Sequence, residues 1–251
     1  MKVLLASILG ILLASAVATN ALAGDFTVVI DAGHGGKKYV GSQQARTLSS
    51  PNNATSPSGL KEKNLTLELA LEVDKQVRAL AKKYPGTRLN CILTRKTDEN
   101  LDFATRASIC TKASPAPTAI VSLHFNASDK HNALGSLCLV NHPGRNPNYR
   151  RDHAFADGLT KATSSAVKQF IPASFPRKPM TDQHLHGGVG SNFFYQLARH
   201  KHLQHTLRCF LEVEFIDRAD IDNALLKKRQ KTFPVIARAI AEYLYQHCQK
   251  Q

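Results

Sequence analysis

The fold is decided by residues 28–36, which read Val28-Val29-Ile30-Asp31-Ala32-Gly33-His34-Gly35-Gly36. An apolar run ends in an acid and is followed by a histidine among glycines, which predicts a buried β-strand that delivers an imidazole at its C-terminal end. The glycines let the backbone turn sharply and let a substrate or ion approach closely. A single histidine after a strand is more often a turn residue. A second strand of the same design strengthens the prediction, because ligands of open α/β sheets bind beyond the carboxyl ends of the strands; it reads Ala119-Ile120-Val121-Ser122-Leu123-His124-Phe125-Asn126.

The first 23 residues are predicted to be a secretory signal peptide. Lys2 gives a positive start, residues 3–17 are almost wholly apolar, and Ala21-Leu22-Ala23 is a small-x-small cleavage site. The alternative, an uncleaved membrane anchor, is disfavoured because this apolar run is shorter than the roughly 20 residues that a spanning helix needs. We therefore expect an exported protein that begins near Gly24 and has no transmembrane anchor after processing. Its expected location is the periplasm or cell envelope, or the medium outside the cell.

The composition is that of a basic protein whose cysteines lack the spacing of a metal-binding or redox motif. The 251 residues include 33 Lys and Arg against 19 Asp and Glu, a formal net charge of +14, which suits an anionic partner such as cell-wall polymer. The basic residues are dispersed without an aromatic-interleaved stripe, so we do not expect nucleic acid as a partner. The five cysteines lack CxxC spacing, and their odd number leaves at least one free thiol. The sequence leaves open any disulfide pairing among Cys91, Cys110, Cys138, Cys209 and Cys248.

Strand and helix patterns alternate along the chain. Apolar runs predict strands at 26–31, 88–94, 118–125, 135–140 and 207–215. Helical periodicity predicts helices at 63–83, 101–111, 149–170, 193–202 and 221–246, the last broken near Pro234. Residues 37–59 are expected to form a long loop, and the sequence leaves open whether it closes over substrate. This order predicts one α/β domain at 24–251, a three-layer αβα sandwich with a mostly parallel central sheet.

Four polar side chains fall where such a sheet places its site. His34 follows the first strand, His124 ends the third, Glu62 begins the first long helix, and Glu212 lies in the apolar strand 207–215. Two imidazoles and a carboxylate form a known catalytic zinc set with one position left for water. Amide hydrolysis also needs a carboxylate that takes the proton of water and gives it to the leaving amine, the role expected of Glu212. Plainer explanations exist, because Glu62 suits the helix dipole in any case and an acidic strand face suits a solvated edge.

Five ordered blocks of sequence resemble one known family. The blocks are residues 29–36, Leu60-Lys61-Glu62-Lys63-Asn64, Leu93-Thr94-Arg95 with Asp98 and Arg106, Ser122-Leu123-His124-Phe125-Asn126-Ala127, and Leu211-Glu212-Val213-Glu214-Phe215. In these blocks the chain resembles the zinc-dependent N-acetylmuramoyl-L-alanine amidases, the catalytic domains of bacterial cell-separation and spore-wall hydrolases.

The resemblance implies a twisted, mostly parallel sheet between helices and one zinc ion held by His34, Glu62 and His124. It implies that the enzyme cleaves the amide between N-acetylmuramic acid and the L-alanine of the stem peptide, with peptidoglycan as substrate. A regulatory or activator protein is a further expected partner, and the sequence leaves the mode of regulation open. Glu214 departs from the small residue usual in the family, which leaves some doubt over which acid is catalytic; alignment on Phe215 favours Glu212. Substrate contacts are expected from Asn126 and Glu214.

Other residues and rival functions stay open at this point. Arg95 and Arg106 suit either a substrate carboxylate or structural pairing with Asp98 or Asp102. A polar rim to the cleft, rather than an accessory metal site, is favoured for the cluster His184, His186, His200, His202 and His205. Rival functions are a zinc hydrolase of the same design that acts on another amide or peptide bond, and a non-catalytic peptidoglycan-binding relative.

Overall fold

The computed structural model describes residues 25–248 except 87 and 186–187, so the predicted signal peptide lies outside the described residues. Its strands are β1 (Asp25–Ala32), β2 (Lys38–Val40), β3 (Arg88–Leu93), β4 (Glu99–Leu101), β5 (Ala119–Asn126), β6 (Leu137–Val140), β7 (Met180–Thr181) and β8 (Leu207–Phe215). Its helices are α1 (Glu62–Lys83), α2 (Phe103–Thr111), α3 (Tyr149–Val167), α4 (Asn192–Ala198), α5 (Ala219–Ile221) and α6 (Arg229–Cys248). In this described part of the chain, no helix has both the length and the apolar character needed to cross a membrane.

Six strands form the central sheet, in the order β3-β1-β5-β8-β6-β7. The first four of these strands run parallel, whereas β6 runs antiparallel to β8. The parallel strands are nearly continuous apolar runs because both faces of the sheet are covered. β1 and β5 are neighbours with Ala32 opposite Leu123, so the chain leaves both strands at the same edge. This is the edge where the sequence predicts the site.

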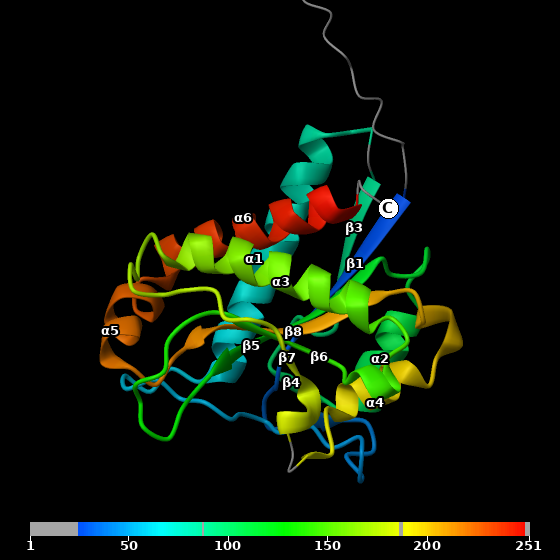
Figure 1. Ribbon diagram of the computed structural model, residues 1–251, viewed down its shortest axis with the longest axis horizontal. Helices are drawn as coiled ribbons and strands as arrows, with labels where there is room; N and C mark the ends of the chain where they lie inside the picture. The colour runs from blue at the N-terminus through cyan, green and yellow to red at the C-terminus, as the bar shows by residue number, and fades with distance from the viewer. Residues whose placement is uncertain (1–24, 87, 186–187, 249–251) are drawn as a thin grey trace, which may run out of the picture.

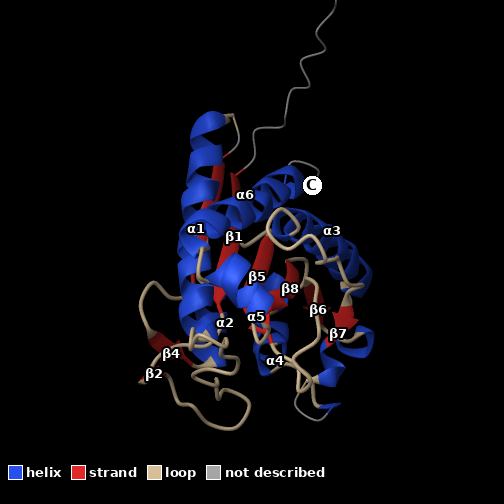
Figure 2. Ribbon diagram, turned by 90° about the vertical axis from the view of Figure 1, so that its left-hand side faces the viewer, coloured by secondary structure: helices blue, strands red, loops and turns tan. Residues whose placement is uncertain are grey.

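Helices cover both faces of the sheet, which confirms the three-layer αβα arrangement (Figure 1, Figure 2). α1, α3 and α6 pack together over one face, and α2 packs with α4 on the other. Successive side chains of β1 point to opposite faces. Val28 and Ile30 therefore enter the larger core beneath α1, α3 and α6, and Val29 enters the smaller core with Phe193 of α4.

Three short strands, β2, β4 and β7, were not predicted, and the last helix differs from its prediction. β2 pairs with β4 in a separate two-stranded sheet, inside a stretch expected to be loop, because three residues carry too little alternation to identify a strand. The predicted break near Pro234 is wrong, since α6 continues through this residue and the interruption comes earlier, at a π-helical turn over Asp222–Leu226. Pro234 lies in the second turn of α6, where its missing N–H removes only one backbone hydrogen bond.

Candidate metal and catalytic site

The turn after β1 carries the first histidine to the carboxyl edge of the sheet. His34 has a left-handed backbone with φ of 61°, which costs roughly 1–2 kcal/mol for a residue other than glycine. Nη2 of Arg106 donates to the carbonyl of His34 at 2.6 Å, and the N–H of Gly33 donates to the carbonyl of Leu123 at 3.0 Å. Gly33 is required here because a Cβ would lie 2.4 Å from the ring of His124.

Two buried arginines hold this turn through hydrogen bonds to its backbone carbonyls. Arg95 donates to the carbonyls of Ala32 and Gly33 at 2.9 Å each. Arg106 donates to the carbonyl of Ala32 at 2.8 Å and pairs with the carboxylate of Asp31 at 2.5 Å. Burial lowers the pKa of Arg95 to about 10, so the side chain stays charged at neutral pH. The structural role that the sequence left open is therefore the one observed, with Asp31 and backbone carbonyls as the partners.

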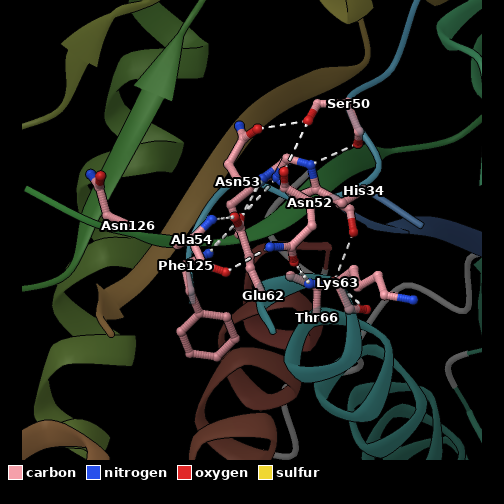
Figure 3. Close-up of polar contacts among 12 residues, drawn as sticks. His34, Ser50, Asn52, Asn53, Ala54, Glu62, Lys63, Thr66, Phe125 and Asn126 are labelled. Atoms are coloured by element: carbon pink, nitrogen blue, oxygen red, sulfur yellow. Dashed lines mark hydrogen bonds and ion pairs between the residues drawn. The ribbon is translucent and has the colours of Figure 1, made fainter. Parts of the chain in front are cut away.

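The first residue of α1 supplies the acid of the site. The Oε2 atom of Glu62 accepts the N–H of Ala54 at 3.0 Å, and its Oε1 atom accepts the N–H of Phe125 at 3.1 Å (Figure 3). Burial raises the pKa of Glu62, but the imidazoles of His34 and His124 more than offset this and hold the pKa well below its ordinary value. Glu62 is therefore an ionised carboxylate fixed between the long loop and β5.

Hydrogen bonds at the outer ring nitrogens assign the tautomers of the two histidines. The hydroxyl of Ser122 donates to Asp31 at 2.5 Å, so it accepts from Nε2–H of His124 at 3.1 Å. Nδ1–H of His34 donates to the carbonyl of Ser50 at 2.9 Å (Figure 3). The free lone pairs are then those of Nδ1 in His124 and Nε2 in His34.

These lone pairs meet at the carboxylate of Glu62. Nε2 of His34 lies 3.0 Å and Nδ1 of His124 lies 3.1 Å from Oε1 of Glu62. With the assigned tautomers these are contacts between acceptors, and a cation among them removes the repulsion. The three ligand atoms lie within 4.8 Å of one another, an arrangement found in no other group of His, Cys, Asp and Glu within the described residues. Two imidazole nitrogens and one carboxylate oxygen are a donor set that fits zinc, so the structure brings together the three residues predicted to bind it.

Glu212 stands beside these three residues on the neighbouring strand. Its Cα is paired in register with that of His124, and both side chains line a pocket of about 130 Å³. Burial raises the pKa of Glu212 well above its ordinary value, and the negative charge of Glu62 raises it further. Its Oε2 atom has no hydrogen-bond partner within the part of the chain that the structure describes. A carboxyl group with a free oxygen and a raised pKa suits the uptake and release of a proton.

Apolar side chains form much of the remaining pocket wall. Phe210 lies edge-on to His124 with ring centroids 5.3 Å apart. The other apolar lining residues are Leu48, Phe103, Leu139 and Leu185. Such a wall holds water away from the site and strengthens electrostatic interactions inside it.

The long loop 37–59 forms one side of this pocket and is tied down at several points. The N–H of Ser42 donates to Asp102 at 2.8 Å, and the amide of Asn100 donates to the carbonyl of Ser49 at 2.8 Å. Gln196 of α4 donates to the carbonyl of Arg46 at 2.9 Å. In this structure these hydrogen bonds hold the loop as one wall of the pocket, and the loop contacts His34 through the carbonyl of Ser50.

A bulge in β8 separates the two acids that the sequence left as rivals. His124 pairs with Glu212 but Asn126 pairs with Phe215, so β8 contains one extra residue between these points. Glu214 is fully buried, and its oxygens accept from the N–H of Gly135 at 2.6 Å and from the hydroxyl of Ser174 at 2.5 Å. Glu214 lies outside the pocket lining and ties two loops to the strand end.

Asn126 also lies outside the pocket lining. Its side chain accepts from the N–H of Ala127 at 2.8 Å and stands apart from the histidine–glutamate group (Figure 3). The expected substrate contacts of Asn126 and Glu214 therefore stay predictions without geometric support.

None of the other histidines whose side chains the structure describes, and none of the cysteines, lines this pocket. His131 contacts Asp217 at 2.9 Å, and His142 accepts from the N–H of Gly144 at 3.1 Å. His202 and His205 are exposed, whereas His186 and the side chain of His184 lie outside the described part of the chain. The five cysteines are free thiols, four of them buried.

Sequence reasoning missed the residues that orient the ligands. Ser122 precedes His124 by two positions on the same strand face, so the alternation of β5 was a signal for it. The carbonyl of Ser50 and the N–H of Ala54 are backbone groups of an irregular loop, and no side-chain pattern marks them.

Comparison with known proteins gives a consistent picture. The family described as N-acetylmuramoyl-L-alanine amidase matches residues 28–244. No curated protein matches the chain.

Several solved structures share the fold. The catalytic domain of CwlV, an N-acetylmuramoyl-L-alanine amidase from Bacillus (Paenibacillus) polymyxa var. colistinus, is 21% identical with a TM-score of 0.61, over 90% of this chain and 99% of that one. The N-acetylmuramoyl-L-alanine amidase AmiC2 of Nostoc punctiforme is 23% identical with a TM-score of 0.59, again over 90% and 99%. The CwlD amidase from Clostridioides difficile, in complex with the GerS lipoprotein, is 16% identical with a TM-score of 0.62, over 90% and 100%.

Proposed function

The chain belongs to the N-acetylmuramoyl-L-alanine amidase family, and on that premise we propose that it is an exported zinc enzyme that hydrolyses the amide between N-acetylmuramic acid and L-alanine in peptidoglycan. The observation that carries the proposal is the meeting of three lone-pair donors on His34, Glu62 and His124 beside the free carboxyl oxygen of Glu212.

A zinc ion held by these three residues would supply Lewis-acid activation of the amide carbonyl and of a water molecule. Glu212 accepts one proton from the attacking water and transfers it to the amide nitrogen as the C–N bond breaks. The products are the lactyl carboxylic acid of the saccharide and the free amine of the stem peptide. Ser50 and Ser122 hold the two imidazoles in the tautomers that leave their lone pairs free.

Export and regulation are parts of the same proposal. The signal-peptide pattern of residues 1–23 supports export to the compartment that contains peptidoglycan. The structure of the CwlD amidase with the GerS lipoprotein supports the further proposal that a protein partner regulates this enzyme.

The test is digestion of purified peptidoglycan by the zinc-loaded protein, with products identified by mass spectrometry. We expect free stem peptides that begin with L-alanine, and a loss of at least about 100-fold in their release for Glu212→Gln, with stoichiometric zinc retained. Glu242→Gln, at a partly exposed acid of α6 that pairs with Arg238, is the matched control and should retain wild-type activity.

Three outcomes would count against the proposal. Fragments cut within the stem peptide would indicate a peptidase of the same design. Binding of peptidoglycan without any cleavage would indicate a non-catalytic relative. Equal activity of Glu212→Gln and wild type would remove Glu212 from the role assigned to it.

A further inference from the structure

A second cavity, of about 260 Å³, adjoins the reaction pocket. Ser191 lines both cavities. Two segments border both cavities. The long loop contributes Leu48 to the first and Arg46 to the second, and the segment before α4 contributes Leu185 to the first and Asp182 to the second. A substrate whose reacting amide lies beside Glu212 can therefore extend past Ser191 into the second cavity.

The first basic group of this cavity is Arg46 of the long loop. Its guanidinium lies over the ring of Tyr195 at 4.6 Å from the centroid, and its backbone carbonyl is held by Gln196. Stacking on an aromatic face orients the guanidinium and leaves its N–H groups free in the plane. Arg46 forms no ion pair with any residue that the structure describes.

The second basic group is Arg145. One of its terminal nitrogens donates to the carbonyl of Val189 at 2.9 Å, which leaves its other N–H donors free. Asp182 lines the same cavity, but its carboxylate pairs with neither arginine. Its oxygens accept from the N–H groups of His142 at 2.9 Å and Ser191 at 2.7 Å. Within the described ranges no carboxylate pairs with Arg145, so both guanidinium groups of the cavity are available to a ligand.

A buried amide completes the wall. Asn141 is 4% exposed and lines the cavity, yet its side chain forms no hydrogen bond with any described residue. Its amide atoms are not among the enclosed, partnerless side-chain atoms of the described residues, so they face the open space of the cavity. Together with two guanidinium groups that pair with no carboxylate among the described residues, this amide offers hydrogen-bond partners that suit a negatively charged polar ligand.

We propose that Arg46, Asn141 and Arg145 form a subsite for a carboxylate of the stem peptide. This inference rests on the proposed function, in which peptidoglycan is the substrate. The chemistry of peptidoglycan then identifies the group that binds here. The hexosamine sugars are neutral, and the lactyl carboxyl is consumed in the scissile amide, so free carboxylates belong to the peptide. Because the two cavities adjoin, the carboxylate bound is that of the residue that follows L-alanine. The subsite thus distinguishes stem peptides in which this carboxyl is free from those in which it is amidated.

The experiment compares two synthetic muramyl tripeptides that differ only in whether the α-carboxyl of the second residue is free or amidated. The zinc-loaded wild type should have a higher kcat/KM for the free acid. Arg46→Gln/Arg145→Gln should lower kcat/KM for the free acid by about 10- to 100-fold and change that for the amide by less than about threefold. Activity on the amidated substrate shows that a variant is folded and loaded with zinc. If the double variant does not fold, Arg145→Gln alone is used in its place. Arg238→Gln, on α6, is the matched control.

Calorimetric binding of L-alanyl-D-glutamate blocked as its γ-methylamide, and of the α-amide of that compound, provides a second readout that does not require catalysis, because the α-carboxyl is then the only carboxylate present. If wild type hydrolyses both tripeptides equally and the arginine variants do not discriminate between them, the subsite is overturned while the proposed function stands. If wild type hydrolyses neither tripeptide but binds the acidic dipeptide through the two arginines, the subsite stands and the proposed function fails. Equal binding of both dipeptides, without hydrolysis, overturns both.

Discussion

At the scale of single residues, the site depends on groups that lie behind the three residues proposed to bind zinc. His124 is oriented by Ser122, and Ser122 is oriented by Asp31, which also pairs with Arg106. Because the hydroxyl of Ser122 donates its hydrogen to Asp31, its oxygen accepts from Nε2–H of His124. The lone pair on Nδ1 of His124 is then directed at the site. Burial raises the pKa of Asp31, but the charge of Arg106 and three hydrogen bonds more than offset this, and the pKa lies below its ordinary value. Asp31 is thus a permanent anion at the base of the series.

The variant Ser122→Ala tests this series. It removes the acceptor for Nε2–H of His124, so the ring is free to adopt the other tautomer, and we expect zinc affinity to fall by about 10- to 100-fold. Competition for zinc with a chromophoric chelator measures the change. Ser165→Ala, at an exposed position of α3, is the control. Unchanged zinc affinity in a folded Ser122→Ala protein would show that the hydroxyl does not orient the ligand.

At the scale of elements, the contact between α3 and β8 contains a buried charge pair away from the site. Asp152 of α3 is fully buried, and its oxygens accept from the amides of Asn146 at 2.8 Å and Asn148 at 3.0 Å. Nε of Arg208 on β8 lies 3.8 Å from the carboxylate, too far for a hydrogen bond. Burial raises the pKa of Asp152 to about 6, although these neighbours lower it. The loss of hydration therefore raises the pKa of Asp152 by more than the hydrogen bonds and Arg208 lower it.

This pKa predicts a pH dependence of stability. Unfolded Asp152 releases its proton near its ordinary pKa of 3.8, whereas the folded protein holds it until about pH 6. The folded state binds more protons over this range, so its stability falls as the pH rises from about 4 to about 6. Asparagine does not titrate, and we expect the stability of wild type relative to Asp152→Asn to fall by up to about 3 kcal/mol between pH 4 and pH 7.

Urea unfolding of both proteins at several pH values measures the difference. A constant difference in the free energy of unfolding across this range would show that Asp152 has an ordinary pKa in the folded state.

The sequence predicted the elements better than their details, for identifiable reasons. Apolar runs such as 207–215 and the periodic helix at 63–83 depend on local patterns that survive in the fold. The three-residue strand β2 and the bulge between Glu212 and Glu214 depend on pairing with distant segments, which no local pattern reports. The same holds for the site: His34 and His124 were found as strand ends, but the backbone groups of the long loop that fix Glu62 could not be.

At the scale of the whole molecule, three separate elements supply the ligands. β1 leads to His34, α1 begins with Glu62, and β5 carries His124. A zinc ion held by all three would link the long loop, the helical layer and the centre of the sheet. Because the unfolded chain has no such preformed set, binding energy at this site adds to the stability of the folded state.

Removal of the metal should therefore lower the melting temperature. With zinc at about 1,000 times its dissociation constant, binding contributes about 4 kcal/mol, which corresponds to about 10 °C for a domain of this size. Scanning calorimetry before and after chelation, and after zinc is added back, measures the shift. His34→Ala is the control, since its melting temperature should no longer respond to zinc. The same melting temperature for the chelated and zinc-loaded wild type would argue against a structural contribution from the ion.

The anchored loop between His34 and Glu62 has a consequence for a cleaved form of the protein. A protease that cuts the exposed tip around residues 44–46 leaves β1 and His34 on one fragment and Glu62 and His124 on the other. β1 lies between β3 and β5 in the sheet, so the small fragment is retained by backbone pairing on both sides. The two pieces would then co-purify as a complemented enzyme and separate only under denaturing conditions.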